Sequence, residues 1–163
     1  MKVEQTKKKE PRLEKGPIIV SIDTSGSMDG HPIKLATCLL MQLLLLARKQ
    51  KRHCFLISFS VEAQYLDLSL PGTWSKLEQF LSDSYSGGTD GNEMLKAGIM
   101  MLKLDNYAMA DMLVISDFFF DLPNFQVMKA MQEEHEKGTR FYGLQIGRGD
   151  CEYDTILDKV WKI

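Results

Sequence analysis

Short apolar runs alternate with longer segments of helical pattern from Gly16 to the end of the chain. The run 18–22 is apolar almost without interruption, which is typical of a strand buried on both faces of a sheet. The same patterning predicts strands at 53–60, 64–68, 112–115 and 141–146, helices at 32–49, 74–82, 92–104 and 123–137, and a short terminal helix followed by an edge strand at 160–163. Strands 53–60 and 64–68 are close enough to form a hairpin. This alternation predicts an α/β domain with a doubly wound, mainly parallel sheet and helices on both faces.

The chain length and charge limit the number of domains and the class of partner. A chain of 163 residues with 44% hydrophobic content suits one globular domain, which we place at 16–163. Residues 1–15 hold six basic and three acidic residues and few large apolar ones, so they predict a disordered basic leader or linker. The other 148 residues hold 14 basic and 19 acidic residues, a net charge of −5. That balance argues against a nucleic-acid-binding face.

The cysteines and the apolar tracts bear on the cellular compartment. Cys38, Cys54 and Cys151 are odd in number and irregular in spacing, and two lie in apolar runs, so we expect buried, reduced thiols. The start of the chain lacks the apolar core of a secretory signal. The longest apolar tract, 35–47, is shorter than the roughly 20 residues that cross a bilayer. We therefore expect a cytoplasmic protein without a membrane span.

Three sets of polar side chains fall where ligands bind in sheets of this kind, beyond the carboxyl ends of the strands. Asp23, Ser25 and Ser27 follow the first strand, Thr89 lies in the glycine-rich loop SYSGGTDG, and the pair Ser116-Asp117 follows the strand 112–115. All of them offer hard oxygen donors, without histidine or cysteine. That donor set favours Mg²⁺ or Mn²⁺ and disfavours zinc. The sequence therefore predicts a magnesium-type site that keeps waters or takes a ligand from outside.

These motifs carry a family resemblance. The pattern D-x-S-x-S at 23–27, the threonine of GGTD and the later strand-end aspartate resemble the three parts of the metal-ion-dependent adhesion site (MIDAS) of von Willebrand factor A (VWA) domains. The segments GPIIVSIDTSGSM and VISDF and the tryptophan near the end of the chain resemble more narrowly the C-terminal VWA domain of ViaA-type proteins. In that family the domain works with a MoxR-type AAA+ ATPase.

The resemblance implies a binding module and not an enzyme. Ser25, Ser27 and Thr89 would bind the cation directly, and Asp23 and Asp117 would contact it directly or through water. One coordination position would stay open for an Asp or Glu of a protein partner. A second intracellular role also remains open, as the VWA component of a CoxE-like or chelatase-like complex that inserts a metal cofactor.

Other functions fit the residues less well. A magnesium-dependent phosphatase with an aspartate nucleophile carries a second aspartate two residues later as general acid, where this chain has Ser25, and Lys96 is poorly placed to hold phosphate. Neither phosphate-loop nor dinucleotide-binding motif occurs. We expect Asp90 to cap the helix that starts near residue 92. For Phe118, Phe119 and Phe120, exposure at the rim of the metal face and burial under the next helix are both open.

Overall fold

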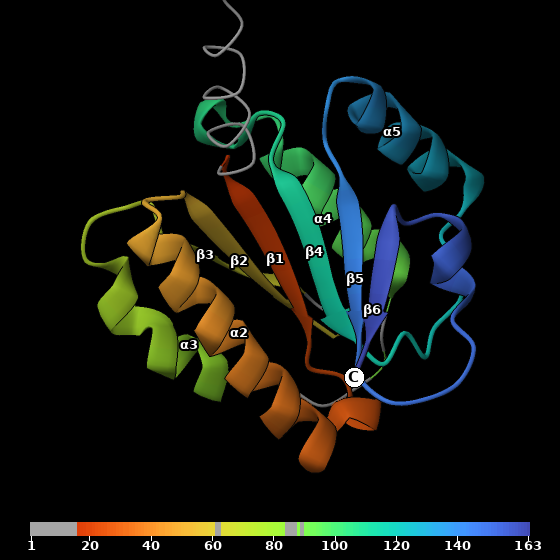
Figure 1. The fold of residues 1–163 in the computed structure, drawn as a ribbon, viewed down its shortest axis with the longest axis horizontal. Helices are drawn as coiled ribbons and strands as arrows, with labels where there is room; N and C mark the ends of the chain where they lie inside the picture. Colours follow the sequence, from red (N-terminus) through yellow and green to blue (C-terminus); the bar gives the residue numbers. More distant parts are fainter. Residues whose placement is uncertain (1–15, 61–62, 84–87, 89) are drawn as a thin grey trace, which may run out of the picture.

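The computed structural model describes residues 16–60, 63–83, 88 and 90–163. Within them, six strands form one sheet in the order β3-β2-β1-β4-β5-β6 (Figure 1). Only the β2–β3 hairpin is antiparallel, and the remaining neighbours are parallel. The strands are β1 (Ile18–Asp23), β2 (Cys54–Phe59), β3 (Ala63–Asp67), β4 (Asp111–Ser116), β5 (Phe141–Gln145) and β6 (Lys159–Lys162). The predicted fold class and hairpin are confirmed. The proposed leader, 1–15, lies outside the described residues.

Helices cover both faces of the sheet (Figure 1). One face carries α2 (His31–Lys49) and α3 (Leu77–Ser82), and the other carries α4 (Gly91–Met101) and α5 (Phe125–Glu136). Each face has its own apolar core. Single 3-10 turns complete the described elements at Gly26–Met28, Thr73–Lys76, Asp105–Tyr107 and Glu152–Thr155.

The central strand β1 positions the candidate site. Alternate side chains of β1 enter opposite cores, with Ile19 facing α4 and α5 and Val20 facing α2 and α3, and both are fully buried. Strand β1 pairs in parallel with β2 and β4, so Asp23 lies beside Phe59 and one residue beyond the Ile22–Ile115 pair. The residues that follow β1 and β4 therefore emerge at one edge of the sheet, the lower edge in Figure 1.

Several helix boundaries differ from the sequence prediction. The helix predicted at 74–82 begins as the 3-10 turn Thr73–Lys76 and becomes α3 only at Leu77. The helix predicted to open at Pro123 starts at Phe125, because the Asn124 side chain accepts a hydrogen bond from the Val127 amide and caps it, which leaves the proline outside. Helix α4 ends at Met101 and not at residue 104. The predicted terminal helix is only a 3-10 turn before the edge strand β6, which confirms the strand.

Helix α2 ends in a Schellman motif. The Arg52 amide donates to the Ala47 carbonyl at 2.9 Å and the Lys51 amide donates to the Arg48 carbonyl at 3.0 Å. Lys51 supplies the left-handed residue of the motif with φ 59°, a conformation that glycine adopts without steric cost.

By length and composition alone, α2 is also apolar enough to cross a membrane. It packs on the sheet through fully buried Leu40 and Leu44, whereas Leu45 and Leu46 are exposed.

The cysteines divide by burial. Cys54 and Cys151 are buried free thiols, whereas Cys38 is an exposed free thiol on α2, so the expectation of buried thiols is wrong for that residue. Burial raises the pKa of the Cys54 thiol to about 12.

Candidate functional site

Asp23 is a fully buried carboxylate at the end of the central strand. Its Oδ1 accepts a hydrogen bond from the Ser25 amide at 2.9 Å, and its Oδ2 accepts one from the Ser116 hydroxyl at 2.6 Å. The first donor lies two residues after Asp23 in the chain, whereas Ser116 ends the neighbouring strand β4, because the parallel pairing of β1 and β4 brings residues 23 and 116 to the same edge. These bonds hold the carboxylate in one orientation.

The electrostatic environment of Asp23 favours a positive ion. Burial raises the pKa of Asp23, and the hydrogen bonds from Ser116 and Ser25 oppose that rise. The negative charge of Asp117, which follows β4, raises the pKa of Asp23 further, and this is the smallest of these effects. A cation bound beside both carboxylates would favour their charged forms.

Two serine hydroxyls lie together just after Asp23. Ser25 is buried and precedes the 3-10 turn Gly26–Met28, whereas Ser27 within the turn is exposed. The turn brings their hydroxyl oxygens to 3.3 Å from each other. Adjacent ligands of an octahedral Mg²⁺ with bonds of about 2.1 Å lie about 3 Å apart. The serine pair therefore has a spacing close to that of neighbouring magnesium ligands.

Of the two remaining predicted ligands, the structure describes Asp117 but not Thr89. Asp117 is partly exposed beyond β4, and its Oδ1 accepts a hydrogen bond from the Phe119 amide at 3.0 Å. Thr89 lies outside the described residues. Asp23, Ser25, Ser27 and Asp117 thus come from two strand ends at one edge of the sheet, as the sequence pattern predicts.

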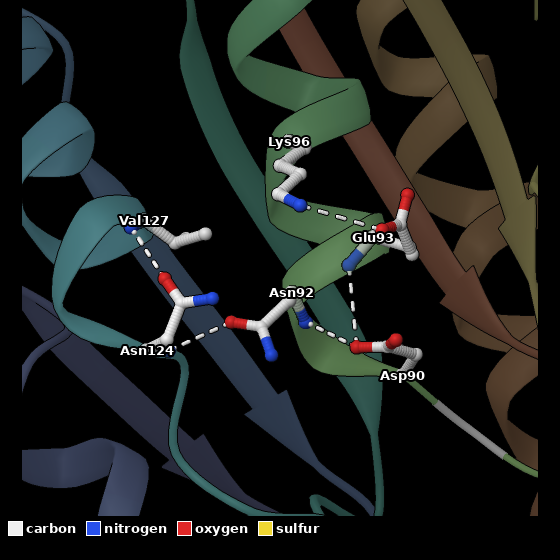
Figure 2. A network of polar contacts seen from close by, with 6 residues as sticks. All are labelled: Asp90, Asn92, Glu93, Lys96, Asn124 and Val127. Atoms are coloured by element: carbon white, nitrogen blue, oxygen red, sulfur yellow. Dashed lines mark hydrogen bonds and ion pairs between the residues drawn. The ribbon is translucent and has the colours of Figure 1, made fainter.

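The residue after Thr89 has a structural role. Asp90 Oδ1 accepts hydrogen bonds from the amides of Asn92 and Glu93 at 2.9 and 3.4 Å, which confirms the predicted cap of α4 (Figure 2). The Asn92 side chain in turn accepts from the Asn124 amide at 2.7 Å (Figure 2). This network ties the starts of α4 and α5 together.

Ser116, which lies beside Asp117 in the sequence pattern but is not among the predicted ligands, orients the site. Besides donating to Asp23, its hydroxyl accepts a hydrogen bond from the Phe118 amide at 2.8 Å. Phe118 has a left-handed backbone with φ 57°, which is uncommon for a bulky residue, and its ring is buried. Ser116 therefore links the orientation of the Asp23 carboxylate to the sharp bend that follows β4. Its place beside Asp117 at a strand end was the available signal.

The three phenylalanines after Asp117 have different environments. Phe118 is buried, Phe120 is partly buried, and Phe119 is 83% exposed. Burial and exposure, the two alternatives left open by the sequence, thus both occur within one tripeptide.

The chemistry of the predicted ligands favours some metal ions over others. Among residues 16–60, 63–83, 88 and 90–163, no cluster of three or more His, Cys, Asp or Glu side chains is placed to hold a metal. The predicted set combines two carboxylates with hydroxyl oxygens, which suits a hard cation that keeps waters. It does not suit zinc, which takes nitrogen and sulfur ligands.

Similar architectures occur among solved structures, although no protein-family model matches the chain. A von Willebrand factor type A protein from Catenulispora acidiphila has a TM-score of 0.67 and 15% identity, covering 91% of this chain and 38% of that one. The SpRpn10 VWA domain has a TM-score of 0.66 and 12% identity, covering 91% and 87% respectively. BatB from Bacteroides thetaiotaomicron has a TM-score of 0.59 and 19% identity, covering 80% and 66%.

The similarity to these solved structures is a similarity of fold. This chain spans less than two thirds of the BatB and Catenulispora chains, whereas it spans most of the SpRpn10 VWA domain. The strand order, the single antiparallel hairpin and the helices on both faces belong to the same architecture. The chain has the fold of von Willebrand factor type A domains.

Proposed function

We propose that this domain is a metal-dependent protein-interaction module and not an enzyme. Asp23, Ser25, Ser27 and Asp117 would hold one Mg²⁺ or Mn²⁺, with Thr89 as a further ligand from outside the described residues. The observation that carries the proposal is a buried aspartate at the end of a central strand, followed by two hydroxyls 3.3 Å apart, with a second carboxylate just after the neighbouring strand β4.

The open coordination position of the cation is the reason why we propose a partner with an acidic side chain. With two protein carboxylates near it and neutral hydroxyls completing its inner shell, the ion keeps enough positive charge to attract a further anion. An Asp or Glu side chain of another protein supplies that anion. We propose a MoxR-type AAA+ ATPase as the partner on the strength of the ViaA-type resemblance, and a cytoplasmic location because the three thiols are free.

Two other functions remain as alternatives. A CoxE-like or chelatase-like complex would use the same cation site with another partner. The phosphatase alternative is weaker, because Ser25 replaces the general acid and Lys96 pairs with Glu93 on a groove lined by α4 and α5. Turnover of p-nitrophenyl phosphate that requires Mg²⁺ and disappears in Asp23→Asn would refute the binding-module proposal.

A thermal unfolding experiment tests the cation site. Ligand at 100 times its Kd stabilises a protein by about 2.7 kcal/mol, which raises the Tm of a domain of this size by about 5–10 °C. We expect Mg²⁺ to raise the Tm of the EDTA-treated protein and to have little effect on Ser25→Ala, Asp117→Asn or Thr89→Ala.

The Ser25 variant should keep its metal-free stability. Among the described residues the Ser25 hydroxyl forms a hydrogen bond only with that of Ser27, and the bond to Asp23 comes from the Ser25 amide. Ser82→Ala is the matched control, because that exposed hydroxyl bonds only to its own helix. An equal Mg²⁺ response in all the variants contradicts the site.

Binding to the ATPase forms a separate test. We expect the purified MoxR-type ATPase to bind the domain in Mg²⁺ and to dissociate in EDTA or when Ser25 is replaced by alanine. Binding of the ATPase that does not depend on metal would contradict this choice of partner. The cation site itself is tested by the thermal unfolding experiment.

A further inference from the structure

A pocket of about 290 Å³ is formed in part by the residues that directly follow Asp117. We call it the aromatic–acidic pocket, and it is lined by Phe118, Phe119, Phe120, Asp121, Asp150 and Glu152. One wall begins at Phe118, directly after Asp117, whose carboxylate accepts a hydrogen bond from the Phe119 amide. A ligand that reaches the cation is therefore close to this pocket.

The floor of the pocket is held in place by ring packing. The ring of Tyr153 lies 5.3 Å from that of Phe118 and 5.2 Å from that of Phe120, measured between centroids. The Tyr153 hydroxyl donates a hydrogen bond to the Asp121 carbonyl at 2.8 Å, which joins the two segments that form the pocket. The cavity therefore exists before a ligand arrives, and binding requires little reorganisation.

The rim of the pocket is negatively charged. Asp121, Asp150 and Glu152 are exposed, and none of them forms an ion pair with a Lys or Arg in the part of the chain that the structure describes. Lys162, on the neighbouring edge strand, lies 3.5 Å from Asp154. The pocket thus combines carboxylates with an exposed aromatic ring.

Arginine is the side chain that suits both features. Its planar guanidinium stacks on aromatic faces and forms forked hydrogen bonds with carboxylates, whereas the lysine ammonium is more strongly hydrated and cannot stack in this way. The charge complementarity of the rim selects a cation, and the ring of Phe119 favours a flat one.

We propose that the aromatic–acidic pocket binds an arginine of the same protein partner whose carboxylate completes the metal site. This inference builds on the proposed function and specifies the partner: it presents an acidic residue and an arginine a few residues apart. The metal contact then gives affinity for any accessible carboxylate, and the pocket selects among them.

Synthetic peptides test the pairing. Fluorescein-labelled Gly/Ser peptides carry one Glu and one Arg separated by one to four residues, and matched peptides carry neutral citrulline in place of Arg. In Mg²⁺, fluorescence anisotropy should show binding at the best spacing, and citrulline should weaken it about threefold to tenfold. Equal binding of the arginine and citrulline peptides would overturn the inference.

Variants locate the effect on the protein. Phe119→Ala and Glu152→Gln should each reduce the preference for arginine over citrulline. Phe125→Ala and Glu133→Gln are the matched controls, because they alter an exposed phenylalanine and an exposed glutamate outside the pocket. A preference for arginine that all four variants retain contradicts the pocket as its source.

A metal-free experiment separates this inference from the proposed function. N-acetyl-arginine methylamide, titrated in EDTA, should shift the amide resonances of 118–121 and 150–152, whereas the citrulline analogue should not. If peptide binding does not depend on Mg²⁺ but these resonance shifts persist, the result contradicts the proposed cation function and supports the pocket. If peptide binding requires Mg²⁺ but the shifts and the preference for arginine are absent, the result supports the cation function and refutes the pocket.

Discussion

Replacing Ser116 with alanine should destabilise the domain well beyond the usual effect of losing a hydroxyl. The Ser116 side chain is fully buried, donates to the Asp23 carboxylate at 2.6 Å and accepts from the Phe118 amide at 2.8 Å. A hydrogen bond to a charged group contributes about 1.5–3 kcal/mol. We expect a loss of about 2–3 kcal/mol in metal-free protein, a fall in Tm of about 4–12 °C for a domain of this size.

The loss should depend on pH in a defined direction. Burial places the folded-state pKa of Asp23 above its unfolded value, so the folded protein binds the extra proton and its stability falls as pH rises through that interval. The Ser116 bond lowers this pKa, and alanine therefore widens the interval. The difference between wild type and Ser116→Ala should grow as pH rises through the pKa of Asp23 and shrink at acid pH.

Urea denaturation in EDTA, followed by circular dichroism, measures both effects. Ser82→Ala is the control, because its exposed hydroxyl donates only to the Glu78 carbonyl of the same helix. A loss below about 0.5 kcal/mol for Ser116→Ala, the range of ordinary surface substitutions, would refute the role assigned to this hydroxyl. A difference that stays constant with pH would refute the link to Asp23.

Three further predictions concern elements away from the site. Lys51→Gly should stabilise the domain by about 0.5–1 kcal/mol in urea denaturation, because glycine adopts the left-handed conformation at the end of α2 without strain. Asn124→Ala should cost about 1 kcal/mol by removing the cap of α5. In native protein at about pH 8, a thiol reagent should modify Cys38 rapidly and leave buried Cys54 and Cys151 unmodified, since burial raises the pKa of both.

Each of these predictions has a result that contradicts it. Lys49→Gly, two residues earlier and still within α2, should lower stability by about 1 kcal/mol, and equal effects at residues 49 and 51 would contradict the end-of-helix argument. Unchanged unfolding of Asn124→Ala would show that the cap is dispensable. Three thiols that react at the same rate in the native protein would contradict the burial pattern.

The sequence predicted the fold because the patterns of the strands and helices agree with their places in the structure. A continuous apolar run identified β1 as a central strand, and the closeness of the second and third strands identified the β2–β3 hairpin. The start of α5 was predicted wrongly because a proline often opens a helix, whereas here Asn124 is fixed by the Asn92 side chain from 32 residues earlier. Such contacts do not appear in local periodicity.

The same limit applies to the candidate site. Asp23, Ser25, Ser27 and Asp117 follow from motif spacing and from the rule that parallel strands end at a common edge. The bond from Ser116 to Asp23 joins residues 93 positions apart and depends on the register of two strands. The aromatic–acidic pocket also needs the packing of Tyr153 beneath two phenylalanine rings, which no pattern in either segment predicts.

The last strand of the sheet affects how copies of this domain can meet. β6 is four residues long and mostly exposed, and it carries Lys159, whose ammonium lies 5.0 Å from the centre of the Trp161 ring, and Lys162. Short edges that carry lysine repel a further strand, because pairing would bring like charges together and strip them of water. Crowded copies of the domain should therefore resist joining edge to edge into a continuous fibre along β6.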